Sequence, residues 1–127
     1  MAANSIILLP SETHTDSNAL PIESIGERQK AAGYYGMTDG FHTVQIQLTS
    51  FIGTVKIQGT LATTPIENDW VDVRMSLQGS TELISELVYA SAASPNVIYN
   101  FVGNFVWVRA VAVNWTTGAI NRILLNF

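Results

Sequence analysis

Residues 41–61 alternate between apolar and polar side chains. Every second residue from Val44 to Leu48 is apolar, and the same period of two returns between residues 54 and 61. This period is typical of a strand with one face against a core and the other toward solvent. Gly53 lies between the two segments, so we predict two antiparallel strands joined as a hairpin over residues 50–53.

The rest of the chain continues this strand-like pattern. Residues 81–89 fit a short helix as well as a strand, and the surrounding segments favour a strand. Residues 104–113 are apolar on both alternating faces, as in a central strand that is covered on both sides. A turn is predicted over residues 114–118, where Gly118 can adopt a positive φ. Further strands are predicted at residues 6–9, 70–76, 97–102 and 119–127.

The strand pattern predicts an all-β protein, an antiparallel β-sandwich with a jelly-roll-like arrangement of about eight strands. The first forty residues differ, because they lack a persistent period and contain Pro10 and Pro21. Apart from the strand at residues 6–9, a short helical turn over residues 24–32 is the one regular element that they suggest. We therefore predict an extended N-terminal arm over residues 1–40 and a β-sandwich domain over residues 41–127.

An arm of this length has no core of its own and is costly to order in isolation. It is expected to wrap its own domain or to dock on a neighbouring subunit, and a partly disordered tail is the alternative. When the arm docks on a neighbour, its apolar residues are the anchors. These residues are Ile6, Leu8, Leu20, Ile22 and Ile25.

Charged side chains are rare in this sequence. They make up 13% of the 127 residues, against roughly 25% in typical soluble domains. The net charge of −4 argues against nucleic acid as a partner, because a phosphate backbone requires a basic face. No apolar run is long enough to span a bilayer, so no membrane partner is expected. The chain has no cysteine, so packing must hold this small domain together, including packing against copies of itself.

Residues with catalytic or metal-binding chemistry are few. The two histidines are His14 and His42, and Asp39 near His42 is the closest approach to a catalytic fragment. Because Asp39 and Gly40 form a common turn sequence, we expect no catalytic residue. The oxygen-rich segment 67–72 lacks the glycine and the acidic spacing of a calcium loop. We therefore expect neither a metal site nor a cofactor.

The aromatic residues suggest an alternative function, which is the binding of glycans. Trp115 lies in a predicted turn, and Tyr34 and Tyr35 lie in the predicted arm, so these three are expected to be exposed. Flat apolar rings beside neutral amides suit sugar rings, and exposed aromatics suit an oligomer interface equally well. Trp70 and Trp107 lie in predicted strands, where core positions are favoured.

Arg109 lies among apolar neighbours in the predicted central strand. A buried guanidinium requires a carboxylate or carbonyl partner. We predict an ion pair with Asp72 or with a residue of a neighbouring subunit.

Two segments, residues 33–65 and 100–110, carry a resemblance to a known family. The sequence Asp-Gly-Phe-His-Thr-Val at residues 39–44, followed by Phe-Ile-Gly-Thr-Val at residues 51–55, is its most distinctive part. The chain resembles small structural proteins of tailed bacteriophages, especially those that infect marine bacteria and cyanobacteria. Capsid decoration, neck and tail proteins of this kind use small β-sandwiches with extended arms. The resemblance implies a virion component and carries over no active site.

The sequence thus predicts a non-enzymatic bacteriophage virion protein that self-associates, with a homotrimer expected. It is expected to attach through its arm to other virion proteins such as the major capsid protein. Because the N-terminus lacks the pattern of a signal peptide, synthesis in the host bacterial cytoplasm is expected. The alternative function is a glycan-binding module for host attachment in a phage fibre or tail.

Overall fold

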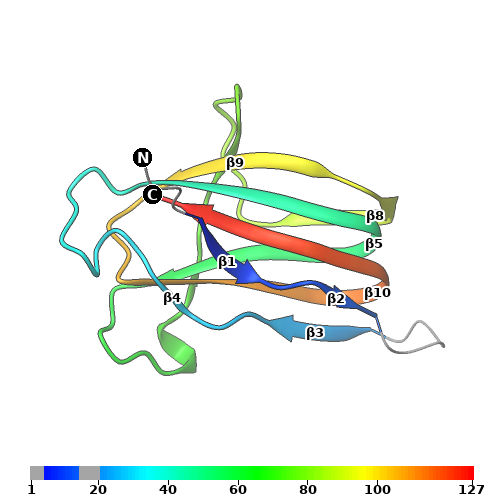
Figure 1. Ribbon diagram of the computed structural model, residues 1–127, viewed down its shortest axis with the longest axis horizontal. Coiled ribbons are helices and arrows are strands. Elements are labelled where there is room, and N and C mark those ends of the chain that lie inside the picture. Colours follow the sequence, from blue (N-terminus) through cyan, green and yellow to red (C-terminus); the bar gives the residue numbers. More distant parts are fainter. Residues whose placement is uncertain (1–4, 15–20) are drawn as a thin grey trace.

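The computed structural model of the chain describes residues 5–14 and 21–127. It confirms the all-β class, because one antiparallel sheet holds the ten strands of this part of the chain (Figure 1). The elements are β1 (Ile6–Leu9), β2 (Glu12–Thr13), β3 (Ile22–Ile25), β4 (Gln29–Lys30), β5 (Phe41–Thr60), the 3-10 turn η1 (Glu67–Asp69), β6 (Val71–Asp72), β7 (Ser76–Leu77), β8 (Leu87–Ala93), β9 (Asn96–Val102) and β10 (Trp107–Asn126).

Two strands of 20 residues each, β5 and β10, form the centre of the sheet. They pair with each other from Trp107 opposite Thr60 to Asn126 opposite Thr43. Both strands double back at the same end of the molecule (Figure 1). Residues from both halves of each strand belong to one buried core. The sheet is therefore folded over into two layers, which is consistent with a sandwich, and the jelly-roll-like connections stay a prediction.

The hairpin predicted over residues 50–53 and the turn predicted over residues 114–118 are wrong, because both segments are bends inside continuous strands. Ser50 and Asn114 have φ values of 49° and 52°, and Gly118 has φ 91°. The β5–β10 register shifts at these bends, as in β-bulges. A bulge bends a strand without ending its pairing, so each strand passes from one layer to the other.

The segment from β8 to β9 follows the same path as β5. β8 pairs with the second half of β5, and β9 pairs with the first half. Ser94 and Pro95 separate the two strands, and a proline has no N–H for a ladder bond. The strand favoured for residues 81–89 is correct only from Leu87 onward. Residues 78–86 form a loop that is joined to Met75 by one bridge at Ile84.

Four short strands of the predicted arm belong to the same sheet, whereas residues 31–40 form a loop. β1 and β2 pair with the second half of β10, and β3 and β4 pair with the first half. The helical turn predicted over residues 24–32 is therefore wrong. Pairing here covers an edge of β10 whose backbone N–H and C=O groups would otherwise lack partners. The boundary predicted after residue 40 thus falls between segments of one sheet.

Candidate functional site

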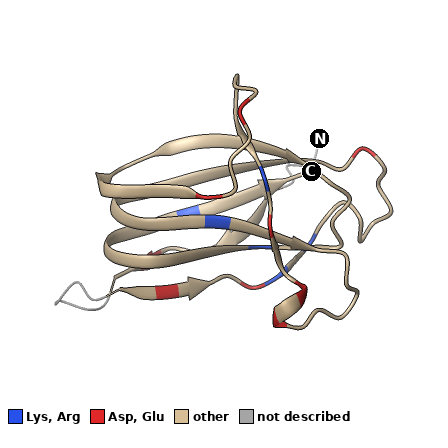
Figure 2. Cartoon of the chain, turned by 180° about the vertical axis from the view of Figure 1, so that it is seen from behind, with Lys and Arg blue, Asp and Glu red and all other residues tan. Residues whose placement is uncertain are grey.

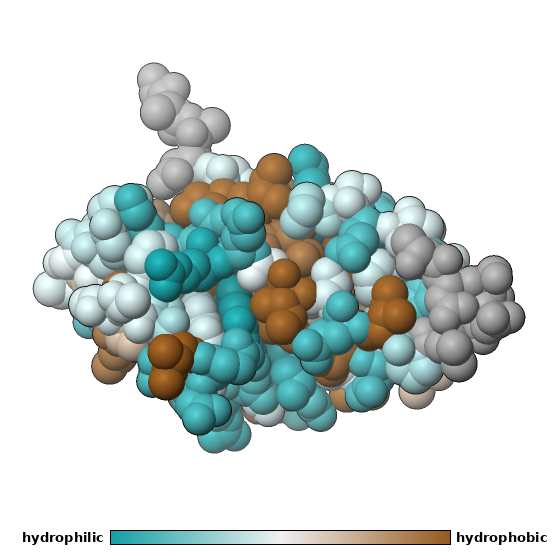
Figure 3. Space-filling model, turned by 90° about the horizontal axis from the view of Figure 1, so that it is seen from below, coloured by the Kyte–Doolittle hydropathy of each residue, from teal (hydrophilic) through white to brown (hydrophobic). Residues whose placement is uncertain are grey.

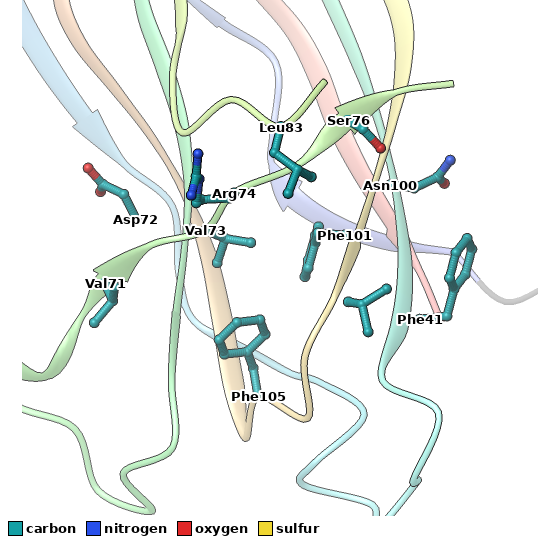
Figure 4. A pocket seen from close by; sticks show the side chains of 11 residues that line it. Phe41, Val71, Asp72, Val73, Arg74, Ser76, Leu83, Asn100, Phe101 and Phe105 are labelled. Atoms are coloured by element: carbon teal, nitrogen blue, oxygen red, sulfur yellow. The ribbon is translucent and has the colours of Figure 1, made fainter. Parts of the chain in front are cut away.

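Several exposed apolar side chains gather around one cleft. Its volume is about 440 Å³, and it lies between the β6–β7 segment and the neighbouring ends of β5 and β9 (Figure 4). Four apolar residues from separate segments line it and remain largely exposed. They are Phe41 (49%), Val71 (63%), Leu83 (52%) and Val102 (69%). Gathered apolar groups of this kind are typical of interaction surfaces.

The face that carries β3 and β4 has a more mixed surface (Figure 3). Figure 3 looks from the side on which β3 and β4 lie in Figure 1, and it shows apolar patches separated by hydrophilic residues. Figure 2 shows that charged positions are scattered over the loops and a few strand positions. Single exposed apolar residues are normal on a protein surface, so the cleft is the stronger candidate.

Two aromatic rings form the floor of the cleft. Phe101 is buried and stacks on His42, with the ring centroids 4.6 Å apart. Phe105 lies against the two glycines Gly59 and Gly103, where an added Cβ would come within 2.7 and 2.5 Å of its ring. The two glycines therefore make room for the ring and fix its position in the floor.

Arg109 holds the segment that leads into one wall of the cleft. Its Nη2 lies 2.8 Å from Oε1 of Glu67, and its Nε donates to Oε1 of Gln58 at 2.9 Å. The guanidinium also lies 4.4 Å from the centroid of the Trp70 ring. Hydrogen bonding to Arg109 and its positive charge lower the pKa of the exposed Glu67 carboxyl. Residues 67–70 are thus fixed against β10.

The ion pair predicted between Arg109 and Asp72 is wrong, because η1 brings Glu67 to the guanidinium instead. Asp72 pairs with Lys56, with Nζ 3.4 Å from Oδ2, and accepts a hydrogen bond from Nε2 of Gln58 at 3.0 Å. The sequence pattern placed the expected acidic partner, Asp72, in a strand. Glu67 was missed because the 3-10 turn that presents it has no strong sequence signal.

The predicted arm anchors have different environments. Leu8 is buried in the chain's own core, and Ile6 and Ile22 are partly buried against it. Ile25 is 46% exposed, whereas Leu20 lies outside the described residues. Sequence reasoning missed Ile7, which is 54% exposed. The uninterrupted apolar run at residues 6–9 gave no period from which to assign its faces.

Ile7 and Ile25 border a second groove, which lies along the arm between β1, β2 and β3. The volume of this groove is about 450 Å³. Glu12 and Ser24 lie in it, and the Ser24 hydroxyl donates to Oε2 of Glu12 at 2.6 Å. The arm edge is therefore more polar than the cleft beside β6 and β7.

The expected exposure of Tyr34 and Tyr35 is confirmed, at 45% and 56%. Their rings have neighbours within the chain, since Nζ of Lys30 lies 4.7 Å from the Tyr34 centroid and Tyr35 stacks on Phe127 at 5.8 Å. The expected exposure of Trp115 is wrong. Trp115 is fully buried, because the bend in β10 turns it toward the core.

Trp107, predicted to be a core residue, is only partly buried. Its indole N–H donates to the carbonyl of Thr63 at 3.1 Å, and the Arg28 guanidinium lies 4.4 Å from its ring centroid. Of the three aromatic residues named for the glycan-binding alternative, Tyr34 and Tyr35 are thus exposed and Trp115 is not.

His42 is a buried structural residue in this fold. Nδ1 lies 2.8 Å from the carbonyl oxygen of Gly40, and Nε2 accepts the backbone N–H of Ala32 at 3.3 Å. This arrangement requires the neutral tautomer with its proton on Nδ1. Burial lowers the pKa of His42, against smaller opposing effects of Gly40 and Asp39.

The oxygen-rich segment 67–72 is occupied by contacts within the protein. Besides the bonds of Glu67 and Asp72, Oδ2 of Asp69 accepts the backbone N–H of Ile66 at 2.9 Å. In residues 5–14 and 21–127, His, Cys, Asp and Glu side chains form no group of three or more that is placed to hold a metal ion. The same ranges contain no helix long and apolar enough to cross a membrane.

Comparison with solved structures finds a similar fold in a phage-derived protein. The crystal structure of the SPBc2 prophage-derived protein YomS matches this chain with a TM-score of 0.56 and 16% sequence identity. The match covers 98% of this chain and 95% of YomS. The two proteins therefore share a fold over nearly their whole length. No protein-family model matches the chain, and no curated protein gives a significant sequence match.

Proposed function

We propose that the chain is a non-enzymatic structural protein of a bacteriophage virion. The observation that carries this proposal is the fold shared with prophage-derived YomS over 98% of the chain. The resemblance of residues 33–65 and 100–110 to small structural proteins of tailed phages supports the same assignment from the sequence.

The surface of the molecule supports a role in assembly. The cleft collects four large exposed apolar side chains, and the arm groove exposes Ile7 and Ile25. Burying such groups between proteins removes apolar area from water, at roughly 25 cal/mol per Å². A low charge content lowers the cost of this burial, since charges lose hydration at an interface.

In this proposal the protein sits on the capsid surface as a decoration protein and docks on the major capsid protein through its arm. The arm contributes its outward-facing residues, Ile7 and Ile25, because Leu8 is committed to the core. Many copies attached to a repeating lattice gain avidity, so each individual contact needs only modest strength.

The test is to purify virions of the phage that encodes the chain by density gradient and to quantify the chain by mass spectrometry. We expect it in intact particles, in a fixed ratio to the major capsid protein. Absence from purified particles, with abundant chain in the lysate, would overturn the proposal.

The docking surface is tested with particles that lack the chain, to which purified protein is added back. An Ile25→Glu variant should bind these particles much less than the natural chain, because it places a charge in an apolar contact. Val88→Glu is the matched control, since Val88 is also an exposed apolar residue and lies on β8, away from the arm. Equal loss in both variants would contradict docking through the arm.

A further inference from the structure

The loop between β7 and β8, residues 78–86, projects from the sheet beside the cleft (Figure 1). Its Leu83 side chain is exposed and contributes to the lining of the cleft (Figure 4). Two backbone hydrogen bonds of 2.8 Å between Ile84 and Met75 hold the base of the loop. A projecting loop thus carries an exposed apolar residue, Leu83, at the rim of a concave apolar surface (Figure 4).

Two exposed charges of opposite sign accompany these apolar surfaces. Arg74 lines the cleft, and Glu82 precedes Leu83 in the loop. Within the part of the chain that the structure describes, neither side chain has an ion-pair partner within 4.0 Å, whereas Lys56 and Arg109 both have one. This face thus presents a positive and a negative group, and each is available to a binding partner.

We propose that this face binds a second copy of the same chain across a two-fold axis. Leu83 of each copy enters the cleft of the other, and Arg74 of each copy lies beside Glu82 of the other. In a two-fold contact every interaction occurs twice, so a face that carries both the projection and its complement is self-complementary. This pairing rests on the proposed virion function, and it replaces the homotrimer expected from the sequence with a two-fold dimer.

The charges favour a second copy over an unrelated apolar partner. A purely apolar occupant would cover the cleft without providing an anion for Arg74 or a cation for Glu82. A second copy provides both at once, and it also covers the exposed Phe41, Val71 and Val102 around the cleft. Charge complementarity of this kind fixes the orientation of the two partners more than it adds affinity.

The test measures the mass of the full-length chain by sedimentation velocity over a range of concentrations. The natural chain is expected to be in equilibrium between monomer and dimer. The variants Arg74→Glu and Glu82→Arg each place like charges opposite each other twice, so each should raise the dimer Kd by about tenfold. Arg122→Glu is the matched control, because it makes the same charge change at an exposed β10 position outside the cleft.

A mixture of the two variants gives the sharpest result. Neither R74E nor E82R should dimerise well alone, whereas an equimolar mixture should restore dimers, since each reversed charge then faces its opposite. All three substituted positions are exposed, and a thermal unfolding curve of each variant checks that it is folded.

Three outcomes would overturn the pairing. They are a natural chain that stays monomeric at every concentration, a trimer as the smallest oligomer, and single variants that associate like the natural chain. If the chain is monomeric yet present in purified virions, the proposed function stands and only the pairing fails. If the chain dimerises as described but is absent from virions, the pairing stands and the proposed function fails.

Discussion

Gly118 lies where the bends of the two long strands meet. Its φ of 91° is left-handed, and an added Cβ would lie 2.2 Å from the carbonyl oxygen of Ser50. Both constraints act on the same residue, so no L side chain fits without moving the β5 backbone. The crossing of β5 and β10 from one layer to the other therefore depends on the absence of a side chain here.

We expect Gly118→Ala to lower the free energy of unfolding by about 3 kcal/mol or more, because backbone strain adds to a clash with backbone atoms. Gly36→Ala is the control, since Gly36 also has a positive φ, of 73°, but no atom lies within 4 Å of an added Cβ. It should cost about 1 kcal/mol. Urea unfolding followed by circular dichroism measures both values, and equal losses would contradict the role of crowding.

His42 makes the stability of the fold depend on pH. Its pKa in the folded chain lies below its ordinary value of 6.5, because burial disfavours the charged ring. As the pH falls below about 6.5, the unfolded chain binds a proton that the folded chain does not, so the folded state loses relative stability. The free energy of unfolding should therefore decrease between pH 7.5 and pH 5.5.

The measurement is urea unfolding at several pH values in this range, which lies above the titration of most carboxyl groups. A His42→Gln variant removes the titrating group and should show a flatter pH dependence, although it is expected to be less stable overall. A natural chain whose stability is constant from pH 7.5 to 5.5 would rule out this effect.

At the scale of elements, the sequence predicts the strands better than it predicts their ends. The period of two correctly placed Val44, Ile46 and Leu48 in the core. It also identified residues 104–113 as central, and this segment is mostly within β10, between the arm strands and β5. Two of the errors arose at Gly53 and Gly118, because a glycine between strand segments marks a hairpin and a bulge equally well.

The candidate site was less predictable than the fold. The cleft is built from Phe41 and from residues within 71–83 and 100–105, which lie apart in the sequence. No local pattern reveals which exposed apolar residues meet there. The partner of Arg109 was missed for the same reason, since Glu67 reaches it through η1. Exposure of Tyr34 and Tyr35 was predictable because they lie in a polar, glycine-rich segment.

The arm is a structural element of the sheet, so its removal should unfold the domain. A deletion of residues 1–14 removes β1 and β2 and takes Leu8 and Leu9 out of the core. Each buried leucine contributes about 2–5 kcal/mol, and the total stability of a domain is about 5–15 kcal/mol. We expect the deletion variant to lose its cooperative thermal transition in circular dichroism.

The control is a deletion of residues 1–4, which removes none of the described residues. It should keep the unfolding transition of the natural chain. A variant without residues 1–14 that melts at the natural temperature would show that the arm strands contribute little to the fold.

At the scale of the whole molecule, the two layers are not separate units. β5 and β10 run through both layers, and the buried residues form one cluster. Neither layer can lose its strands without exposing the core of the other. The cleft and the projecting loop therefore sit on a support that unfolds as a unit, so their relative position is set by the fold as a whole.

The position of β10 in the chain has a consequence for synthesis. β10 pairs with β1, β2, β3, β4 and β5, and the ribosome makes every one of them before it makes β10. At about 5–20 residues per second, the 20 residues of β10 take roughly 1–4 s to translate. During that time the nascent chain exposes unpaired strand edges with apolar side chains. The central sheet can therefore complete its pairing only after β10 has been made, and until then those edges are open to mispairing.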